Sequence, residues 1–173
     1  RKQDPDVIAD LGTGSGVLLA ECLHFFKAAS GLAVEESAAA ISLAEENFEQ
    51  LGLADRVSCF LGSWMDWTGW ATCDLIISNP PYIESAVIPT LAPEVRDYDP
   101  LAALDGGPDG LKAYREIIAQ GSIDMKSGAH LVLEIGYDQK DSVSSLLRSA
   151  GFTDLEYQQD ISGHTRVIAA TKT

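Results

Sequence analysis

Asp10-Leu11-Gly12-Thr13-Gly14-Ser15-Gly16 is the stretch of sequence that decides the fold. It lies between an apolar run at residues 7–11, which predicts a strand, and a longer run at residues 17–29, which predicts a helix. Glycine adopts positive φ at no steric cost and lets the backbone approach a bound molecule closely. The N–H groups that open the following helix can hold a polar or anionic group. Residues 10–16, called the glycine turn below, are therefore predicted to bind a ligand.

An acidic residue follows the glycine turn at a spacing that suits a nucleotide. Glu35 ends the second predicted strand about twenty residues later, where a carboxylate can accept hydrogen bonds from both hydroxyls of a ribose. The dinucleotide fingerprint G-x-G-x-x-G does not fit, because Gly16 comes one residue early and Val17 takes the expected position. The G-x-G-x-G form after an acidic residue is typical of enzymes that use S-adenosylmethionine. Two plainer interpretations stay open: a tight turn without a ligand, and a surface acid at Glu35 whose role Glu36 could take.

Two residues after the third predicted strand, residues 57–61, are candidates for the adenine end of such a ligand. Trp64 follows that strand at the place where an adenine lies in this topology, and Ser63 can offer a hydrogen bond to the adenine edge. Trp64, Trp67 and Trp70 also recur at helical spacing. Packing of these aromatic rings in the core is therefore the competing interpretation.

The rest of the chain alternates between strand-like and helix-like runs. Strands are predicted at residues 7–11, 32–35, 57–61, 73–78, 131–135, 152–158 and 166–171, and helices at residues 17–29, 38–51, 111–121 and around Val143, Leu146, Leu147 and Ala150. Such alternation is typical of a parallel sheet with helices on both faces, and the short last connection requires an antiparallel hairpin. The predicted fold is therefore α/β and Rossmann-like, with a seven-stranded, mostly parallel sheet. Residues 80–110 lack clear periodicity, and a loop of that length is usually functional.

Asn79-Pro80-Pro81-Tyr82, called the corner below, follows the fourth predicted strand. Open α/β sheets bind ligands at this edge, near the point where strand order reverses. The nitrogen of an amide or aromatic amine is a poor nucleophile because its lone pair is delocalised. If the side-chain oxygen of Asn79 accepts one N–H and the carbonyl of Pro80 accepts the other, the lone pair turns out of conjugation and toward a methyl donor. The prolines fix φ and so aim that carbonyl, and the ring of Tyr82 can face the planar group and its developing positive charge.

The corner therefore supplies the predicted catalytic residues, Asn79, Pro80 and Tyr82, and Pro81 joins them in binding the substrate. No strong general base is required, because the leaving group is a neutral thioether and the proton can leave after transfer. Positioning and electrostatics carry the rate. Two adjacent prolines can also form a merely rigid turn, but the glycine turn upstream favours the catalytic interpretation.

Composition argues against several other classes. The 173 residues fit one domain, residues 1–173, and no apolar run approaches the length of a membrane-spanning helix. No membrane is therefore expected as a partner, and a formal net charge of −14 repels phosphate backbones, so nucleic acid is not expected either. Cys22, Cys59 and Cys73 have no metal-type spacing, and the three histidines are equally scattered. The sequence therefore predicts reduced thiols and no metal site.

The glycine turn, the corner and residues 100–115 together resemble the HemK/PrmC family, the protein N5-glutamine methyltransferases that act on peptide chain release factors. The Asn-Pro-Pro-Tyr sequence alone is shared with adenine and guanine N-methyltransferases, so the residues downstream are more specific. These are Leu104, Gly107-Pro108-Asp109-Gly110-Leu111, Tyr114-Arg115-Glu116-Ile117-Ile118 and Leu133-Glu134-Ile135-Gly136. The resemblance covers nearly the whole chain.

This resemblance implies a class I S-adenosylmethionine-dependent methyltransferase domain whose cofactor product is S-adenosylhomocysteine. The implied substrate is the glutamine of a Gly-Gly-Gln loop in a release factor, in the cytoplasm or an organelle. The cofactor contacts expected from the motifs and the resemblance together are Asp10, Gly12, Thr13, Gly14, Gly16, Glu35, Ser63, Trp64 and Asn79.

The sequence departs from the family pattern at three places. The chain starts at Arg1, and the N-terminal helical domain with which the family docks the release factor is expected to be missing from it. Ser63 stands where the family commonly has Asp, and Glu35 replaces a more usual Asp, which moves the carboxylate out by one methylene.

Two other functions remain as alternatives. An N-methyltransferase of adenine or guanine in RNA or DNA would place a flipped base in the same corner. The negative charge and the lack of a basic stripe interleaved with aromatic residues argue against it. A non-catalytic module that only binds S-adenosylmethionine is expected to have lost the corner, and residues 79–82 retain it.

Overall fold

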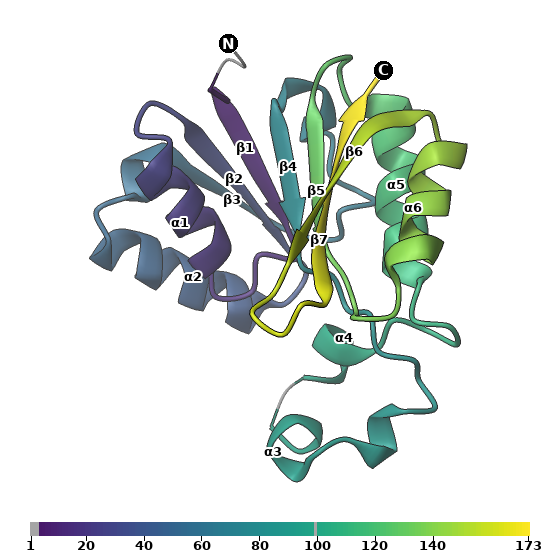
Figure 1. Ribbon diagram of the computed structural model, residues 1–173. Helices are drawn as coiled ribbons and strands as arrows, with labels where there is room; N and C mark the ends of the chain where they lie inside the picture. Colours follow the sequence, from purple (N-terminus) through teal and green to yellow (C-terminus); the bar gives the residue numbers. More distant parts are fainter. Residues whose placement is uncertain (1–3, 99) are drawn as a thin grey trace.

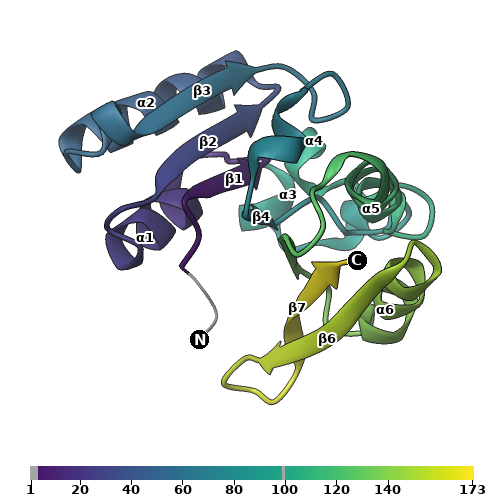
Figure 2. The ribbon, with the colours of Figure 1, turned by 90° about the horizontal axis from the view of Figure 1, so that it is seen from above.

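The computed structural model describes residues 4–98 and 100–173 of the chain. A seven-stranded sheet runs through it in the order β3-β2-β1-β4-β5-β7-β6 (Figure 1, Figure 2). The strands are β1 (Val7–Leu11), β2 (Ser30–Glu35), β3 (Val57–Leu61), β4 (Leu75–Ser78), β5 (His130–Glu134), β6 (Phe152–Gln159) and β7 (Thr165–Lys172). Strands β1 to β5 pair in parallel, whereas β7 is antiparallel to both β5 and β6. The predicted α/β fold with its antiparallel terminal hairpin is confirmed.

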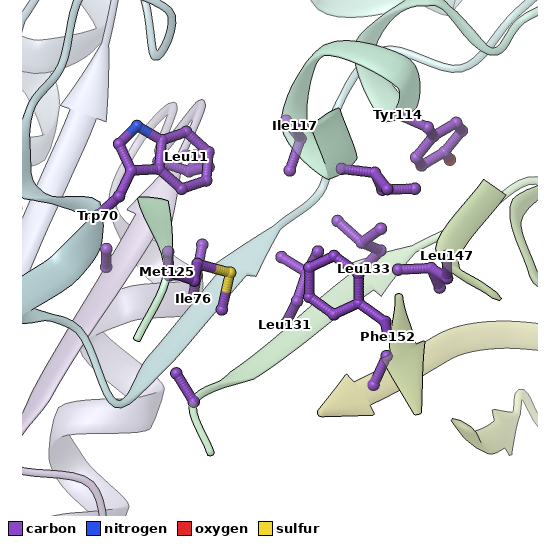
Figure 3. Packing of buried hydrophobic residues seen from close by; sticks show 14 of the residues in the cluster. Leu11, Trp70, Ile76, Tyr114, Ile117, Met125, Leu131, Leu133, Leu147 and Phe152 are labelled. Carbon is purple, nitrogen blue, oxygen red and sulfur yellow. The ribbon is translucent and has the colours of Figure 1, made fainter. Parts of the chain in front are cut away.

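Helices cover both faces of this sheet. The longer ones are α1 (Val17–Phe25), α2 (Ala38–Gln50), α5 (Lys112–Asp124) and α6 (Lys140–Ser149), with single 3-10 turns η1 (Ala54–Arg56) and η2 (Gly69–Thr72) between strands. Successive side chains of a strand point to opposite faces, so the interior divides into two buried clusters. One cluster packs Leu19 of α1 and Phe48 of α2 against the sheet. The other packs Ile117 of α5 and Leu147 of α6 against the opposite face (Figure 3).

Several predicted boundaries were wrong by a few residues. Helix α1 ends at Phe25 rather than at residue 29, because Phe26 leaves helical geometry and its N–H caps the carbonyl of Cys22. Strand β4 begins at Leu75 rather than at residue 73, after the 3-10 turn that precedes it. Helix α5 runs past Gly121, which was predicted as its end. A Cβ on Gly121 would lie 3.0 Å from the sulfur of Met125, so the glycine allows close packing inside the helix.

The segment after the corner was expected to be an irregular loop, and it instead contains three short helices. These are η3 (Ile88–Thr90), α3 (Pro93–Arg96) and α4 (Leu101–Leu104), which project from the carboxyl edge of the sheet (Figure 1). A bridge between Ile83 and Asp105 closes the base of this projection. The N–H of Ile83 donates to the carbonyl of Leu104 at 3.0 Å, and the N–H of Gly106 donates to the carbonyl of Ile83 at 2.8 Å.

The carboxyl edge of the sheet gathers the sequence motifs. Strand β1 leads into the glycine turn, β2 ends at Glu35, β3 leads toward Ser63, and β4 leads into the corner. Strand β1 lies between β2 and β4, so the strand order reverses beside the glycine turn. Within the described residues, no helix is long and apolar enough to cross a membrane, and no group of three or more His, Cys, Asp or Glu could hold a metal ion.

Candidate active site

The glycine turn is anchored to strand β2 and open toward solvent. The N–H groups of Gly12 and Thr13 both donate to the carbonyl of Val34, at 2.8 and 3.1 Å. Gly16 has φ +79°, and a Cβ there would lie 2.5 Å from the ring of Phe48, so only glycine fits between the turn and α2. A Cβ on Gly14, in contrast, would meet no atom within 4 Å. The turn is therefore rigid on its inner side and accessible on its outer side.

Asp10 is a buried residue that stabilises the glycine turn through a hydrogen bond to Thr13. Its side chain is 1% exposed, and its Oδ2 accepts a hydrogen bond from the hydroxyl of Thr13 at 2.8 Å. Burial raises the pKa of Asp10 from 3.8 to about 7, although the Thr13 hydrogen bond opposes this rise. The hydrogen bond between Asp10 and Thr13 thus stabilises the conformation of the turn. The direct cofactor contacts predicted for both residues stay predictions.

Asp10→Asn should make stability less dependent on pH. The folded carboxyl keeps its proton up to about pH 7, whereas an unperturbed carboxyl loses it near pH 3.8. The folded state therefore binds the extra proton in this window. The contribution of Asp10 to the free energy of unfolding is therefore fully present below pH 3.8, the pKa of the unfolded state. It is lost as pH rises through about 7, the pKa of the folded state. Asparagine has no such proton to lose. Thermal melts should show the variant gaining several degrees in Tm relative to wild type between about pH 4 and about pH 8. A difference that stays constant over that range would contradict the raised pKa.

Glu35, not Glu36, faces the glycine turn. One carboxylate oxygen of Glu35 accepts from the N–H of Gly14 at 3.0 Å, and the other accepts from the N–H of Ser37 at 2.9 Å. Each oxygen retains further acceptor capacity, because an ionised carboxylate offers about four lone-pair positions. Glu36 is exposed. The structure therefore favours Glu35 as the acceptor that could hold ribose hydroxyls beside the turn.

Trp64 forms a wall beside the same turn. A Cβ on Gly12 would lie 3.5 Å from its ring, and its indole N–H donates to Glu116 at 3.3 Å. Ser63 is half-buried, and its hydroxyl accepts from the N–H of Met65 at 3.2 Å. The adenine contacts predicted for Trp64 and Ser63 stay predictions.

The other two tryptophans belong to the core. Trp67 and Trp70 are buried, with ring centroids 5.7 Å apart, which confirms the packing interpretation for this pair. The helical spacing of the three tryptophans does not correspond to a helix, because residues 64–66 form a turn and Trp70 lies in η2.

The corner lies next to the glycine turn because β4 and β1 are neighbouring strands of the sheet. Ser78, the last residue of β4, is in register with Leu11 of β1, and its buried hydroxyl donates to the carbonyl of Leu11 at 2.7 Å. The next residue, Asn79, is exposed, whereas Pro80 is buried. Within residues 4–98 and 100–173, neither the Asn79 side chain nor the Pro80 carbonyl has a hydrogen-bond partner. Two acceptors therefore remain available at the carboxyl edge.

A cavity of about 490 Å³ opens beside Tyr82, the last residue of the corner. Tyr82, Val87 and Leu91 form part of its wall, and within residues 4–98 and 100–173 no lysine or arginine lines it. Three carboxylates stand along it: Glu84, Asp109 and Asp138. Hydrogen bonds from the Arg115 guanidinium lower the pKa of Asp109 to about 2, so that carboxylate stays ionised. The cavity thus suits a neutral or cationic group better than a phosphate. A second cavity, of about 510 Å³, lies at the opposite edge of the sheet, beside His130 and Thr171.

Three residues that are distant in sequence from the site form hydrogen bonds to it. None of them was predicted as a site residue. The amide of Asn47 donates to the carbonyl of Ser15 in the glycine turn at 2.9 Å. Glu116 holds the indole of Trp64, as described above. Gln139 donates to the carbonyl of Tyr82 in the corner at 3.0 Å. No local pattern marks Asn47 or Gln139, whereas Glu116 lies in the stretch 114–118 that carries part of the family resemblance.

The sequence of the chain is similar to those of known methyltransferases. Residues 1–93 match the family described as methyltransferase small domain. The release factor glutamine methyltransferase of Caulobacter vibrioides is 45% identical over 163 residues, covering 94% of this chain and 56% of that protein. The protein of the same name from Bradyrhizobium diazoefficiens is 42% identical over 166 residues, covering 95% of this chain and 56% of that protein. The predicted resemblance is confirmed, and the chain spans little more than half the length of these curated relatives.

Solved structures share the fold at low sequence identity. A SAM-dependent O-methyltransferase from Thermotoga maritima superposes with a TM-score of 0.70 at 17% identity, covering 96% of this chain and 59% of that one. An RNA methyltransferase from Salinibacter ruber, in complex with S-adenosyl-L-homocysteine, superposes with a TM-score of 0.61 at 15% identity, covering 96% and 81%. These neighbours establish the fold alone. Because the family match extends over more than half of the 173 residues, the chain belongs to the methyltransferase small domain family.

Proposed function

We propose that this chain is the catalytic domain of an S-adenosylmethionine-dependent enzyme that methylates the side-chain amide of glutamine in the Gly-Gly-Gln loop of peptide chain release factors. The observation that carries the proposal is the placement of two unused acceptors, Asn79 Oδ1 and the Pro80 carbonyl, next to the glycine turn through the Ser78–Leu11 hydrogen bond. The curated relatives with this name support the choice of substrate.

The residues at the glycine turn fit S-adenosylmethionine. Space in front of Gly14 admits a ligand, and the spare acceptor positions of Glu35 suit two ribose hydroxyls. The ring of Trp64 beside Gly12 suits an adenine face. Asp10 and Thr13 hold the turn in shape from below.

The corner performs the chemistry by holding the amide. S-adenosylmethionine supplies an electrophilic methyl group on a sulfonium. Asn79 Oδ1 accepts one N–H of the glutamine amide and the Pro80 carbonyl accepts the other, which turns the nitrogen lone pair toward that methyl. The bond from nitrogen to carbon forms as the bond from carbon to sulfur breaks, and one amide proton then passes to water. Tyr82 lies half-buried beside the group and can face its developing positive charge. The rate comes from positioning and from fixed dipoles rather than from a general base.

The charge distribution supports a protein substrate over a nucleic acid. The cavity presents the carboxylates of Glu84 and Asp138, with that of Asp109 paired to Arg115, and among the residues that the structure describes no basic one lines it. A phosphate backbone entering this region would meet repulsion, on top of that from the net charge of −14. A polypeptide loop carries no such penalty. We therefore propose a release factor as the partner and the cytoplasm, where translation takes place, as the location.

A methylation assay on the two substrate classes tests this function. Enzyme and S-adenosylmethionine labelled in the methyl group are incubated with a release factor, with the same release factor carrying Gln→Ala in its Gly-Gly-Gln loop, or with tRNA and rRNA. We expect label on the first protein alone, and a mass gain of one methyl group on the glutamine. Label on nucleic acid alone would refute the protein substrate and favour adenine or guanine methylation. Cofactor binding without transfer to any substrate would favour the non-catalytic module.

A further inference from the structure

Gln139 is the N-cap residue of α6, yet its side chain makes no cap hydrogen bond to that helix. It reaches instead to backbone groups of the corner and of two other segments. Its amide nitrogen donates to the carbonyl of Tyr82 at 3.0 Å and to the carbonyl of Gly110 at 3.1 Å. Its amide oxygen accepts from the N–H of Gly136 at 3.0 Å and lies 3.4 Å from the hydroxyl of Tyr114. Both N–H groups and one lone pair of the amide are therefore used, whereas the single proton of the Tyr114 hydroxyl is shared with the carbonyl of Glu134, which lies closer at 2.9 Å.

The chemistry of these partners requires glutamine in one orientation. The carbonyls of Tyr82 and Gly110 can only accept, so both must face the NH2 group. The N–H of Gly136 can only donate, so it must face the oxygen. Glutamate at this position would bring a carboxylate oxygen against two carbonyl oxygens. Alanine would leave both carbonyls without their partner.

This side chain joins the corner to a second segment that packs against it. A Cβ on Gly110 would lie within hard contact of the Tyr82 carbonyl, and a Cβ on Gly106 would lie 2.8 Å from Tyr82 Cα. The two backbones thus approach as closely as glycine allows. The N–H of Lys112 donates to the carbonyl of Gly106 at 3.0 Å, which carries this contact on into α5.

The position of Tyr82 decides where the acceptors of the corner point. Pro80 and Pro81 fix their own φ angles, so a displacement at Tyr82 is transmitted to the Pro80 carbonyl with little loss. A shift of about 1 Å in a reacting group can cost on the order of 100-fold in rate. The glycine turn, in contrast, is held by Val34 and Glu35 on the other side of β1.

We infer that Gln139 is a positioning residue for methyl transfer: by holding the Tyr82 carbonyl it keeps the two acceptors of the corner in line with the cofactor. This inference rests on the proposed function. It predicts an effect on kcat that is separate from cofactor binding. Its structural part, the bracing of the corner, can be measured without any substrate.

The first measurement is amide hydrogen exchange on wild type, Gln139→Ala and the matched control Gln158→Ala. Gln158 is exposed on β6, and among the described residues its side chain bonds only the carbonyl of its neighbour Gln159. In Gln139→Ala the amides of Ile83 and Gly106 should exchange roughly 10-fold faster or more, while that of Gly12 stays unchanged. Equal acceleration at all three amides would mean global destabilisation, and no acceleration would mean that Gln139 braces nothing; either outcome overturns the inference.

The second measurement is methylation kinetics on a release factor. For Gln139→Ala we expect kcat to fall about 10- to 100-fold while the cofactor Kd stays within about twofold. Gln139→Glu should lose at least as much activity at neutral pH, because an ionised carboxylate offers no donor to the carbonyls of Tyr82 and Gly110. Wild-type kcat in Gln139→Ala or in Gln139→Glu would overturn the positioning role. If the wild-type chain does not methylate the release factor, the proposed function is wrong. The hydrogen-exchange experiment still tests, independently of that function, whether Gln139 stabilises the corner.

Discussion

Asn79→Ala should lower kcat for glutamine methylation by roughly 10²- to 10³-fold while cofactor affinity stays nearly unchanged. Removal of one preorganised hydrogen-bonding group at a reacting centre typically costs this much. Asn79 is exposed at the end of β4 and has no partner of its own among the described residues, so its loss should leave the fold intact. Steady-state methylation of a release factor measures kcat, and calorimetric titration with S-adenosylmethionine measures Kd.

Asn79→Asp provides the control for this experiment. Aspartate keeps an acceptor oxygen at the same distance from the backbone, so it should retain more activity than alanine. Wild-type turnover in Asn79→Ala would show that the side chain does not hold the amide. A joint loss of turnover and cofactor affinity would assign Asn79 to the cofactor site instead.

Glu35→Ala should have the opposite signature, raising the cofactor Kd roughly 100-fold or more with kcat at saturating cofactor largely retained. A hydrogen bond to a charged group contributes about 1.5–3 kcal/mol, and Glu35 is placed to make two to the ribose. The substitution also removes the acceptor for the N–H groups of Gly14 and Ser37, which loosens the turn further. Titration calorimetry and thermal melts on the same samples separate binding from stability.

Glu36→Ala is the matched control, because Glu36 is the adjacent acid and is exposed. It should bind cofactor as wild type does. Glu35→Gln should fall between wild type and Glu35→Ala, since an amide keeps one acceptor oxygen. Weaker binding in Glu36→Ala than in Glu35→Ala would reverse the assignment of the two acids.

The parts of the site that the sequence predicted are those that follow directly from strand ends. Val7–Leu11 and the run before Asn79 are short apolar strands, and parallel strands bring their carboxyl ends to one edge. The glycine turn, Glu35 and the corner therefore meet by topology. Local sequence is enough for this inference.

The parts that the sequence did not predict depend on contacts between distant segments. Gln139 and Tyr82 are 57 residues apart, Trp64 and Glu116 are 52 apart, and Asn47 and Ser15 are 32 apart. Such pairs leave no periodic trace in one sequence. The helices η3, α3 and α4 were missed for a different reason, because three or four residues make about one turn and cannot display a 3.6-residue repeat.

The fold by itself does not identify the substrate. Its structural neighbours are described as acting at oxygen or on RNA, with the same sheet. What distinguishes this chain is the corner, with its acceptors free and its backbone held by Gln139, beside a cavity that carries negative charge. The choice between a glutamine amide and a nucleobase rests on those features and on the curated relatives.

The most direct test is a crystal structure of the chain with S-adenosylhomocysteine and a Gly-Gly-Gln peptide. The proposed mechanism predicts the glutamine nitrogen within about 3 Å of both Asn79 Oδ1 and the Pro80 carbonyl, facing the cofactor sulfur. An Asn79 side chain that turns away from the sulfur, with no space for an amide between them, would contradict it.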